Sequence, residues 1–562
     1  MRPFLALVVL LINIAFGTIA QLDVPAVSDD NGGTLVTLSV EFRPGYGDTY
    51  VSVAPFAGEE FQQSVQSAVD YVRSSRNISN MDILIRSNAA GKAYLLDGPS
   101  AGAAMAIISL SLVDGKPLQQ DITITGGIGA DGSIIPVGGL PEKAAVASAT
   151  GKKAILVPLS SAEDSAMLER ISSESGIIVV HYSSIEEAYR VFITEENLPI
   201  KNISYPPVQY TSASKLPRAT PNRQFSGAVS KMISTLSAEV ENIRESHPSA
   251  YAYFKAKQQL AESLYEMGYT YSAGNEAFLA LTKMHALEAD LSDDGLAASS
   301  ESTTNCLKRV ENNLRNYRGP LDGYANAELR YYWARSVMDT LKLPAVTLPS
   351  RLQTAYALRQ AELWCAIAED LSTGDASGTP VNVGGLKGTD EKLLRLYFAS
   401  SGDHLAKGVD AYLRGYYGAA LMELSMHASE VNSTYPEKPD SYLASEWVQM
   451  MEAHSNYLES NPDYGVGSAG VIRRFAVIAD RHLSDASITS TSQKNETAIS
   501  TKNAITAGGD TGAGCVSSLF CDSFGLTLLM LLCIFTLVVI AHKLLHRGGG
   551  RKRWRIRTSL QR

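Results

Sequence analysis

Two glycine-rich turns set a serine and a lysine in the N-terminal third of the chain. The first is Asp97-Gly98-Pro99-Ser100-Ala101-Gly102, whose glycines allow a tight strand-to-helix turn that exposes the hydroxyl. The second is Pro136-Val137-Gly138-Gly139-Leu140-Pro141-Glu142-Lys143, which puts the lysine at the start of a helix. A lysine can act as the base for a serine nucleophile only where burial keeps its amine neutral. The apolar run Ala144-Ala145-Val146 supplies such surroundings.

The stretch from residue 33 to residue 194 mixes strand and helix patterns. Runs rich in β-branched residues predict strands, and amphipathic or Ala-rich runs predict helices. The expected strands are 34–42, 49–53, 83–85, 122–128, 133–137, 154–157 and 177–182, and the expected helices are 58–72, 100–112, 141–150, 162–172 and 185–192. Asp131-Gly132 is typical of a hairpin turn between two of these strands. The sequence therefore predicts a compact α+β domain over residues 21–197.

Beyond this domain the apolar pattern becomes helical. Residues 198–224 hold five prolines among Ser, Thr and Lys, a composition typical of a linker. Residues 225–483 show the apolar period of amphipathic helices without a fixed repeat, and they predict an all-helical domain. Residues 484–514 are dominated by Ser, Thr, Ala, Asn and Gly, which bury too little apolar surface to fold. We expect a flexible stalk over residues 484–523.

Both ends of the chain carry apolar segments. Residues 1–20 have the order of a secretory signal, with Arg2 first, then an apolar run, then small residues, and we expect cleavage after Ala20. An uncleaved N-terminal anchor is the alternative. Phe524 to Ala541 is an 18-residue run without a charge, long enough to span a bilayer core of about 30 Å and to contact membrane lipid. Residues 542–562 are basic, so the positive-inside rule places them in the cytoplasm and residues 21–523 outside.

Charge and cysteine content exclude several classes of partner and cofactor. The formal net charge is −9, and residues 542–562 contribute eight positive charges, so residues 1–541 carry −17. An acidic body argues against nucleic acid as a partner. The five cysteines are Cys306, Cys365, Cys515, Cys521 and Cys533. Their spacing indicates neither a disulfide framework nor a metal site, and no cofactor is expected; Cys515 and Cys521 either pair or stay free.

The serine turn by itself fits a second kind of enzyme. Gly98-Pro99-Ser100-Ala101-Gly102 matches the G-x-S-x-G nucleophile elbow of α/β-hydrolases. An elbow hydrolase also needs a histidine after the serine, and the α+β domain offers only His181. A lone histidine at a strand end is typically structural, but an esterase or lipase using His181 stays open at this point.

Taken together, the motifs resemble the proteolytic domain of the Lon proteases, which are Ser-Lys peptidases. The resemblance runs from Gly33 to Phe192 and rests on the order of elements, the two turns, Thr125-Gly126, and Gly151-Lys152-Lys153-Ala154-Ile155-Leu156-Val157-Pro158. It implies that Ser100 is the nucleophile and Lys143 the general base. It also implies that Thr125 hydrogen-bonds the lysine and that Asp97 modulates the serine. Assembly into a homo-oligomeric ring is implied by the resemblance alone.

The chain departs from the family pattern in three places. Gly127 stands where the family usually has a glutamate after the Thr-Gly pair. Arg86 and Asn88 stand where histidines are often found before the serine. No G-x-x-x-x-G-K-[ST] sequence occurs, so the phosphate-binding loop of the family's ATPase module is missing.

These observations predict a membrane-anchored, extracytoplasmic serine endopeptidase without its own ATPase. A Ser100/Lys143 dyad would hydrolyse protein or peptide substrates, and the helical domain would restrict or recruit them. The alternative from another class is a surface scaffold or adhesion protein whose peptidase domain is vestigial.

Overall fold

The computed structural model describes residues 18–27, 33–54, 56–78, 80–89, 97–194, 203–208, 216–341, 343–373, 378–397, 399–431, 445–461 and 467–503. The chain divides into two units between Ser492 and Gln493, and the elements below belong to the first unit, apart from the end of the last helix. Most of the predicted signal, the predicted span 524–541 and the tail 542–562 lie outside the described residues. Among the residues that are described, no helix is both long and apolar enough to cross a bilayer.

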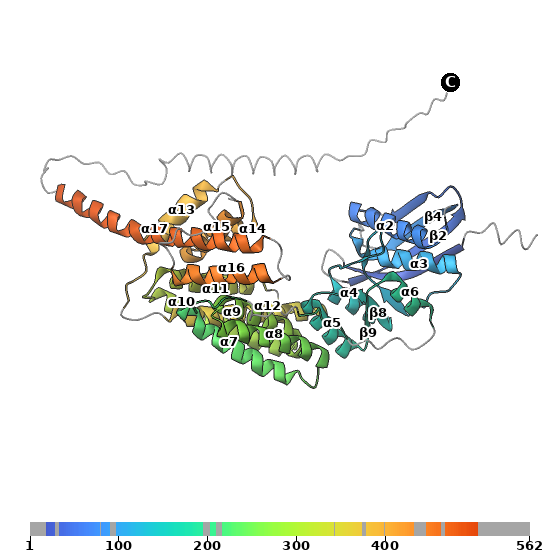
Figure 1. The fold of residues 1–562 in the computed structure, drawn as a ribbon, viewed down its shortest axis with the longest axis horizontal. Helices are drawn as coiled ribbons and strands as arrows, with labels where there is room; N and C mark the ends of the chain where they lie inside the picture. The colour runs from blue at the N-terminus through green and yellow to red at the C-terminus, as the bar shows by residue number, and fades with distance from the viewer. Residues whose placement is uncertain are drawn as a thin grey trace, which may run out of the picture. The chain divides into compact units, whose positions relative to one another are not determined.

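A four-stranded sheet begins the α+β domain, with the strand order β1-β2-β4-β3. Figure 1 labels two neighbouring strands of this sheet, β2 and β4. Its strands are β1 (Thr18–Val27), β2 (Gly33–Pro44), β3 (Thr49–Ala54) and β4 (Met81–Ala89). The β1–β2 and β2–β4 pairs are antiparallel, whereas β3 and β4 are parallel. Alternate residues of β2, namely Val36, Leu38 and Val40, are buried in one apolar core with α2 (Glu59–Ser75) and α3 (Gly102–Asp114).

A second, parallel sheet carries the later half of the domain. It comprises β5 (Ile122–Ile124), β8 (Ala154–Pro158) and β9 (Ile178–Tyr182), and the connecting helices are α4 (Leu140–Ala149), α5 (Ala162–Ser175) and α6 (Ile185–Ile193). Every residue of β8 is buried because both faces of the sheet are covered. Ile155 and Val157 pack in the same core as α4 and α5, whereas Ala154 and Leu156 pack in the core that contains α3.

The structure differs from the predicted strands in two places. The expected strand 122–128 is two strands, since β5 ends at Ile124 and the short β6 (Gly127–Ile128) pairs separately with β7 (Ile134–Ile135). Strand β1 begins at Thr18, inside the segment expected to be a signal. Cleavage after Ala20 would remove three residues that pair with β2, from Thr18 opposite Phe42 to Ala20 opposite Val40.

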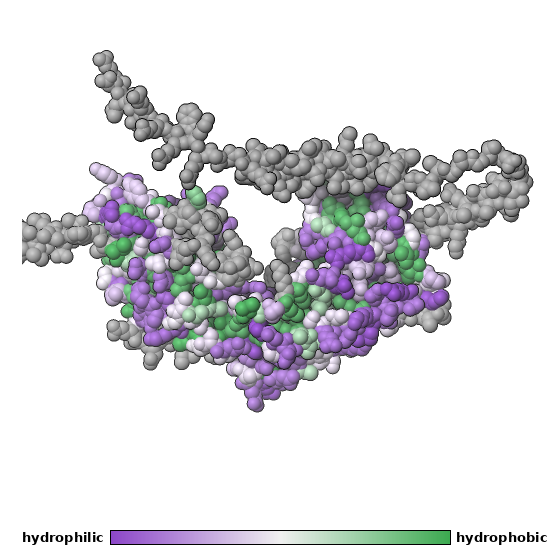
Figure 2. Space-filling model, turned by 180° about the vertical axis from the view of Figure 1, so that it is seen from behind, coloured by the Kyte–Doolittle hydropathy of each residue, from purple (hydrophilic) through white to green (hydrophobic). Residues whose placement is uncertain are grey.

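The elements of the second domain are helices, apart from an isolated β-bridge between Arg318 and Pro380. Its helices are α7 (Arg223–Asn242), α8 (Pro248–Glu266), α9 (Thr270–Glu288), α10 (Asp293–Arg315), α11 (Leu321–Thr340), α12 (Leu348–Ser372), α13 (Val383–Leu396), α14 (Asp403–Leu413), α15 (Tyr417–Val431), α16 (Glu446–Ser460) and α17 (Ser468–Asn503). The chain is therefore an α+β domain followed by a helical domain. On the face drawn in Figure 2, hydrophobic and hydrophilic residues alternate in small patches over the described surface.

Part of the predicted linker is packed. Ile203 is buried, Ser204 accepts a hydrogen bond of 3.1 Å from the Ser165 hydroxyl, and Tyr205 stacks on Tyr253 with ring centroids 5.4 Å apart. The Tyr205 hydroxyl also donates to Glu169 at 2.9 Å. Residues 203–208 thus pack between α5 and α8 because aromatic and apolar side chains interrupt the proline-rich composition.

Two features of the helical domain differ from expectation. Cys306 of α10 and Cys365 of α12 form a disulfide, although the cysteine spacing indicated no disulfide framework. Helix α17 continues past Leu483, where we expected the stalk to begin. Its first turns beyond Leu483 are held by packing, because Ala486 is fully buried and its carbonyl accepts a hydrogen bond of 2.7 Å from the Asn382 side chain.

Candidate active site

Ser100 lies in a single turn of 3₁₀ helix, η1 (Pro99–Ala101), that runs directly into α3. Gly98 precedes the turn with φ 93° and ψ 154°, a conformation that is essentially restricted to glycine. Pro99 follows at the first helical position, where its missing N–H costs nothing. The Ser64 hydroxyl of α2 donates to the Pro99 carbonyl at 3.0 Å and so ties the turn to α2.

The break between β5 and β6 anchors the serine. The Gly126 amide donates to the Ser100 carbonyl at 3.0 Å, and the Ala103 amide donates to the Gly126 carbonyl at 3.1 Å. The buried Thr125 hydroxyl donates to the same Ser100 carbonyl at 3.4 Å. The Thr125 amide still donates to the Leu156 carbonyl of β8, but both backbone groups of Gly126 bond to the serine turn, so the strand predicted over residues 122–128 is interrupted there.

Lys143 lies in the first turn of α4, after Gly139, which adopts the left-handed conformation with φ 69°. Only 4% of its surface is exposed. Burial lowers the pKa of Lys143 to about 8, and the neighbouring Glu142 carboxylate opposes this shift. The helix N-terminus also disfavours positive charge. Lys143 therefore has the buried, weakly basic amine that a serine nucleophile needs.

The other two predicted site residues have partners of their own. The Thr125 hydroxyl donates to the Ser100 carbonyl, not to the Lys143 amine as the resemblance implied. Asp97 is exposed and accepts hydrogen bonds from the amides of Gly98 at 2.9 Å and of Phe61 at 3.2 Å. Because Phe61 is in the first turn of α2 and Gly58 offers no side-chain cap, Asp97 acts as the cap of that helix.

The Ser100 hydroxyl and the Lys143 amine form no hydrogen bond with each other or with any other side chain that the structure describes. Such catalytic hydrogen bonds often tighten only when substrate is bound. The Ser100 hydroxyl and the Lys143 amine are therefore available to a substrate, whereas the Thr125 and Asp97 side chains form hydrogen bonds that support the fold.

His181, the base of the esterase hypothesis, lies on β9 opposite Val157 and is 6% exposed. Its neighbour Tyr182 directs its hydroxyl to the Thr125 carbonyl at 3.1 Å. Successive side chains of a strand point to opposite faces, so His181 points away from the Thr125 side of the sheet. This arrangement disfavours His181 as a base for Ser100.

Comparison with known proteins agrees with these elements. Residues 26–193 match the family model of the Lon protease (S16) C-terminal proteolytic domain. This part of the chain is a Lon-type proteolytic domain. The Lon protease of Chloroflexus aggregans is 31% identical over 176 residues, which are 29% of this chain and 21% of the relative. The Lon protease of Escherichia coli K12 is 35% identical over 140 residues, or 24% of this chain and 18% of the relative.

The match is confined to one domain, and the chain spans about a fifth of the length of these curated relatives. The Lon-type domain is of the serine-peptidase class. Two of its supporting residues, Tyr182 and Ser64, were not identified from the sequence. The sequence held one indication that Tyr182 supports the site, namely the glycine at position 126. A Cβ atom on residue 126 would lie 1.8 Å from the Tyr182 hydroxyl, so only glycine leaves room for it. No group of three or more His, Cys, Asp or Glu side chains within the described ranges could hold a metal ion.

Proposed function

We propose that the chain is an endopeptidase that hydrolyses peptide bonds with Ser100 as nucleophile and Lys143 as general base. The observation that carries the proposal is the burial of Lys143, which lowers its pKa to about 8 inside a Lon-type proteolytic domain. A lysine with an ordinary pKa near 10.5 is almost fully protonated at neutral pH and cannot accept a proton.

The proposed reaction follows from these two side chains. The neutral Lys143 amine accepts the Ser100 proton while Oγ attacks the peptide carbonyl, and the ammonium then returns the proton to the leaving amine. The same amine then takes a proton from a water that attacks the acyl carbon, and it passes this proton to Ser100 Oγ as the C–Oγ bond breaks and the acid product leaves. The amides of Ser100 and Ala101 lie at the start of the helical turn that runs into α3, where the helix dipole favours negative charge, so they are the oxyanion donors that we propose.

The substrates we propose are exposed or already unfolded segments of proteins. The sequence holds no phosphate-binding loop for an ATPase that would unfold a stable substrate. The helical domain occupies the rest of the described chain and would select or recruit these segments. A homo-oligomeric ring remains part of the proposal on the strength of the family alone.

We further propose that Phe524 to Ala541 anchors the chain in a membrane, with both domains outside the cytoplasm. Its uncharged 18 residues and the basic segment that follows support this topology. The Cys306–Cys365 disulfide also supports it, because disulfides persist in oxidising compartments. A reporter fused after Arg562 should resist protease added to intact cells, while the helical domain is digested. Digestion of the reporter would contradict the topology.

The test of activity uses the full-length chain in detergent with unfolded casein and a serine-directed acylating probe. Ser100→Ala and Lys143→Ala should each reduce cleavage by at least 1,000-fold, the usual cost of removing a member of a catalytic pair. Ser74→Ala and Lys116→Ala, which change outlying residues of the same kinds, should keep wild-type activity. Wild-type protein that neither cleaves casein nor reacts with the probe would contradict the proposal and favour the vestigial-scaffold alternative.

A further inference from the structure

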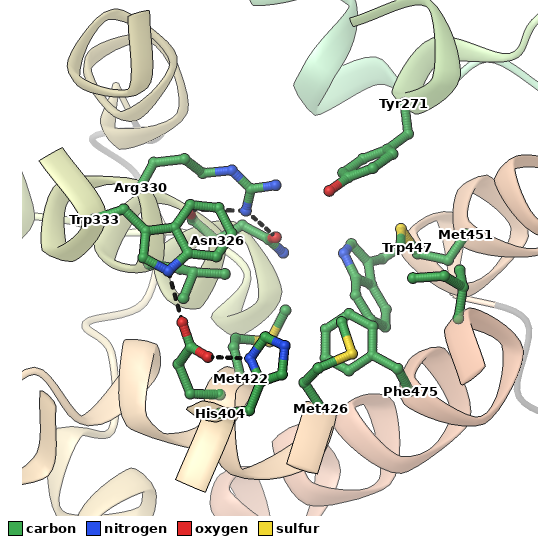
Figure 3. A pocket seen from close by; sticks show the side chains of 13 residues that line it. Tyr271, Asn326, Arg330, Trp333, His404, Met422, Met426, Trp447, Met451 and Phe475 are labelled. Carbon is green, nitrogen blue, oxygen red and sulfur yellow. Dashed lines mark hydrogen bonds and ion pairs between the residues drawn. The ribbon is translucent and has the colours of Figure 1, made fainter. Parts of the chain in front are cut away.

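The helical domain contains a cavity that the peptidase chemistry does not use. Helices α9, α11, α14, α15, α16 and α17 surround it, and the space it encloses is about 50 Å³ within a hollow that opens to solvent. Its walls are mostly aromatic and methionine side chains (Figure 3). A mostly apolar lining with a few polar groups is typical of a ligand site, and the enclosed space is large enough for one end of a small ligand.

One charged side chain stands out in the lining. Arg330 of α11 is 5% exposed, and its guanidinium lies over the rings of Phe225 and Trp333 at 5.2 and 5.6 Å. It donates to the Asn326 side chain at 2.7 Å, but no carboxylate in the described part of the chain forms an ion pair with it. Buried arginines normally have an acidic partner. Burial lowers the pKa of Arg330, so an anion at this position would stabilise its charged form.

The one acidic residue of the lining already has hydrogen-bond donors of its own. Glu423 accepts hydrogen bonds from the Trp333 indole and from His404 Nδ1, both at 2.6 Å. The Glu423 carboxylate raises the pKa of His404, which favours an imidazolium beside it. Glu430 also lies 3.6 Å from His404 Nε2, and Glu423 forms no ion pair with Arg330 among the described residues.

Further hydrogen-bond donors converge on the same space. Figure 3 shows the Arg330 guanidinium, the Tyr271 hydroxyl and the indole nitrogen of Trp447 turned toward the cavity. The Trp447 side chain is 1% exposed, and its N–H donates to no acceptor among the residues described. Opposite these donors the lining is apolar, with Met422, Met426 and Phe475. A ligand that satisfies both parts has a small anionic end and an apolar body.

We propose that this cavity binds the carboxylate of an apolar or aromatic acid, with Arg330 as its anchor and the methionine and aromatic side chains around its body. A planar carboxylate matches the fork of a guanidinium. A free phosphate would leave the apolar wall unoccupied and its own oxygens without partners. The acid can be the C-terminal residue of a polypeptide or a free small molecule, and both share the chemistry that the site recognises. The proposal stands independently of the peptidase function.

The experiment compares matched acid and amide ligands on the full-length chain carrying Ser100→Ala, so that no ligand is cleaved. Binding of N-acetyl-phenylalanine, its amide, and a pentapeptide ending in Phe with a free or amidated terminus is measured by calorimetry. Each acid should bind at least tenfold more tightly than its amide. Tighter binding of the free-acid pentapeptide would assign the site to polypeptide C-termini, and tighter binding of N-acetyl-phenylalanine to free acids. Equal binding of acid and amide, or binding of neither acid at millimolar concentration, would overturn the proposal.

Two variants locate the site within the chain. Met426→Trp fills the cavity and should abolish acid binding, whereas Leu413→Trp, at the exposed end of α14, should not change it. Arg330→Lys keeps the positive charge but not the forked geometry of the guanidinium, and it should reduce the preference for acid over amide.

Inorganic phosphate is the remaining probe. If phosphate competes as strongly as the acid does, the apolar part of the proposal is contradicted. If Arg330→Lys unfolds, Met426→Trp still tests the site, because the thermal midpoint of the Met426→Trp variant shows separately whether that variant is folded.

Discussion

The Tyr182 hydroxyl donates a hydrogen bond of 3.1 Å to the carbonyl of Thr125, across the break between β5 and β6. Gly126 follows Thr125 with φ 155°, and its amide holds the Ser100 carbonyl. One tyrosine of β9 therefore supports the backbone that positions the serine turn.

We expect Gly126→Ala to destabilise this backbone. Its new methyl group would lie 1.8 Å from the Tyr182 hydroxyl, and the positive φ strains any residue but glycine. The loss should be about 2–4 kcal/mol, seen as a lower thermal midpoint together with loss of cleavage. Gly138→Ala is the matched control, because no atom lies within 4 Å of its added methyl group. A Gly126→Ala variant as stable as Gly138→Ala would contradict the steric argument.

Lys143→Met should be inactive but more stable than wild type at neutral pH. The folded-state pKa of about 8 lies below the ordinary value of 10.5, so the folded state binds the proton less tightly than the unfolded state. Stability therefore rises with pH between these values, and at pH 7 the buried charge costs about 3 kcal/mol. Thermal unfolding at pH 7 and pH 10.5 checks this, since the advantage of the methionine should shrink at the higher pH. A variant less stable than wild type at pH 7 would refute the expectation.

Glu142→Gln should move the acid limb of the pH–rate profile to lower pH. The Glu142 carboxylate raises the pKa of Lys143, so its removal lets that pKa fall further and leaves more neutral amine at pH 7. The amide oxygen can still accept the hydrogen bond that Gln353 of α12 donates to Glu142. Glu174→Gln, an exposed carboxylate of α5, serves as the control and should not move the limb. If the acid limb of Glu142→Gln moves to higher pH, the Glu142 carboxylate does not raise the pKa of Lys143 and the expectation is contradicted.

Replacing both Cys306 and Cys365 by Ala should destabilise the helical domain by about 2–4 kcal/mol, because the disulfide closes a long loop between α10 and α12. The thermal midpoint of wild type should fall on reduction, while that of the double variant should not respond to reductant. A linked peptide pair in an unreduced digest checks that the bond forms. Finding both thiols free in protein from the native compartment would contradict it.

Local patterns predicted much of the fold. The serine turn, the start of the Lys143 helix and most strands and helices depend on interactions between residues close in the sequence, such as glycine conformations, caps and apolar periods. The α+β domain was recognisable for that reason. The amphipathic stripe of Val229, Met232 and Leu236 is buried, as the helical period of α7 indicates.

Long-range packing decided the rest. The split of residues 122–128 depends on the serine turn and on Tyr182, 57 residues after Thr125. The disulfide joins cysteines 59 residues apart, and the Arg330 cavity is assembled from six helices. No local pattern encodes such contacts, because each partner is an ordinary buried residue until the fold brings it close. The sequence alone thus determined which serine and lysine are candidates, and only the tertiary structure decided that the lysine is buried enough to lose its proton near neutral pH.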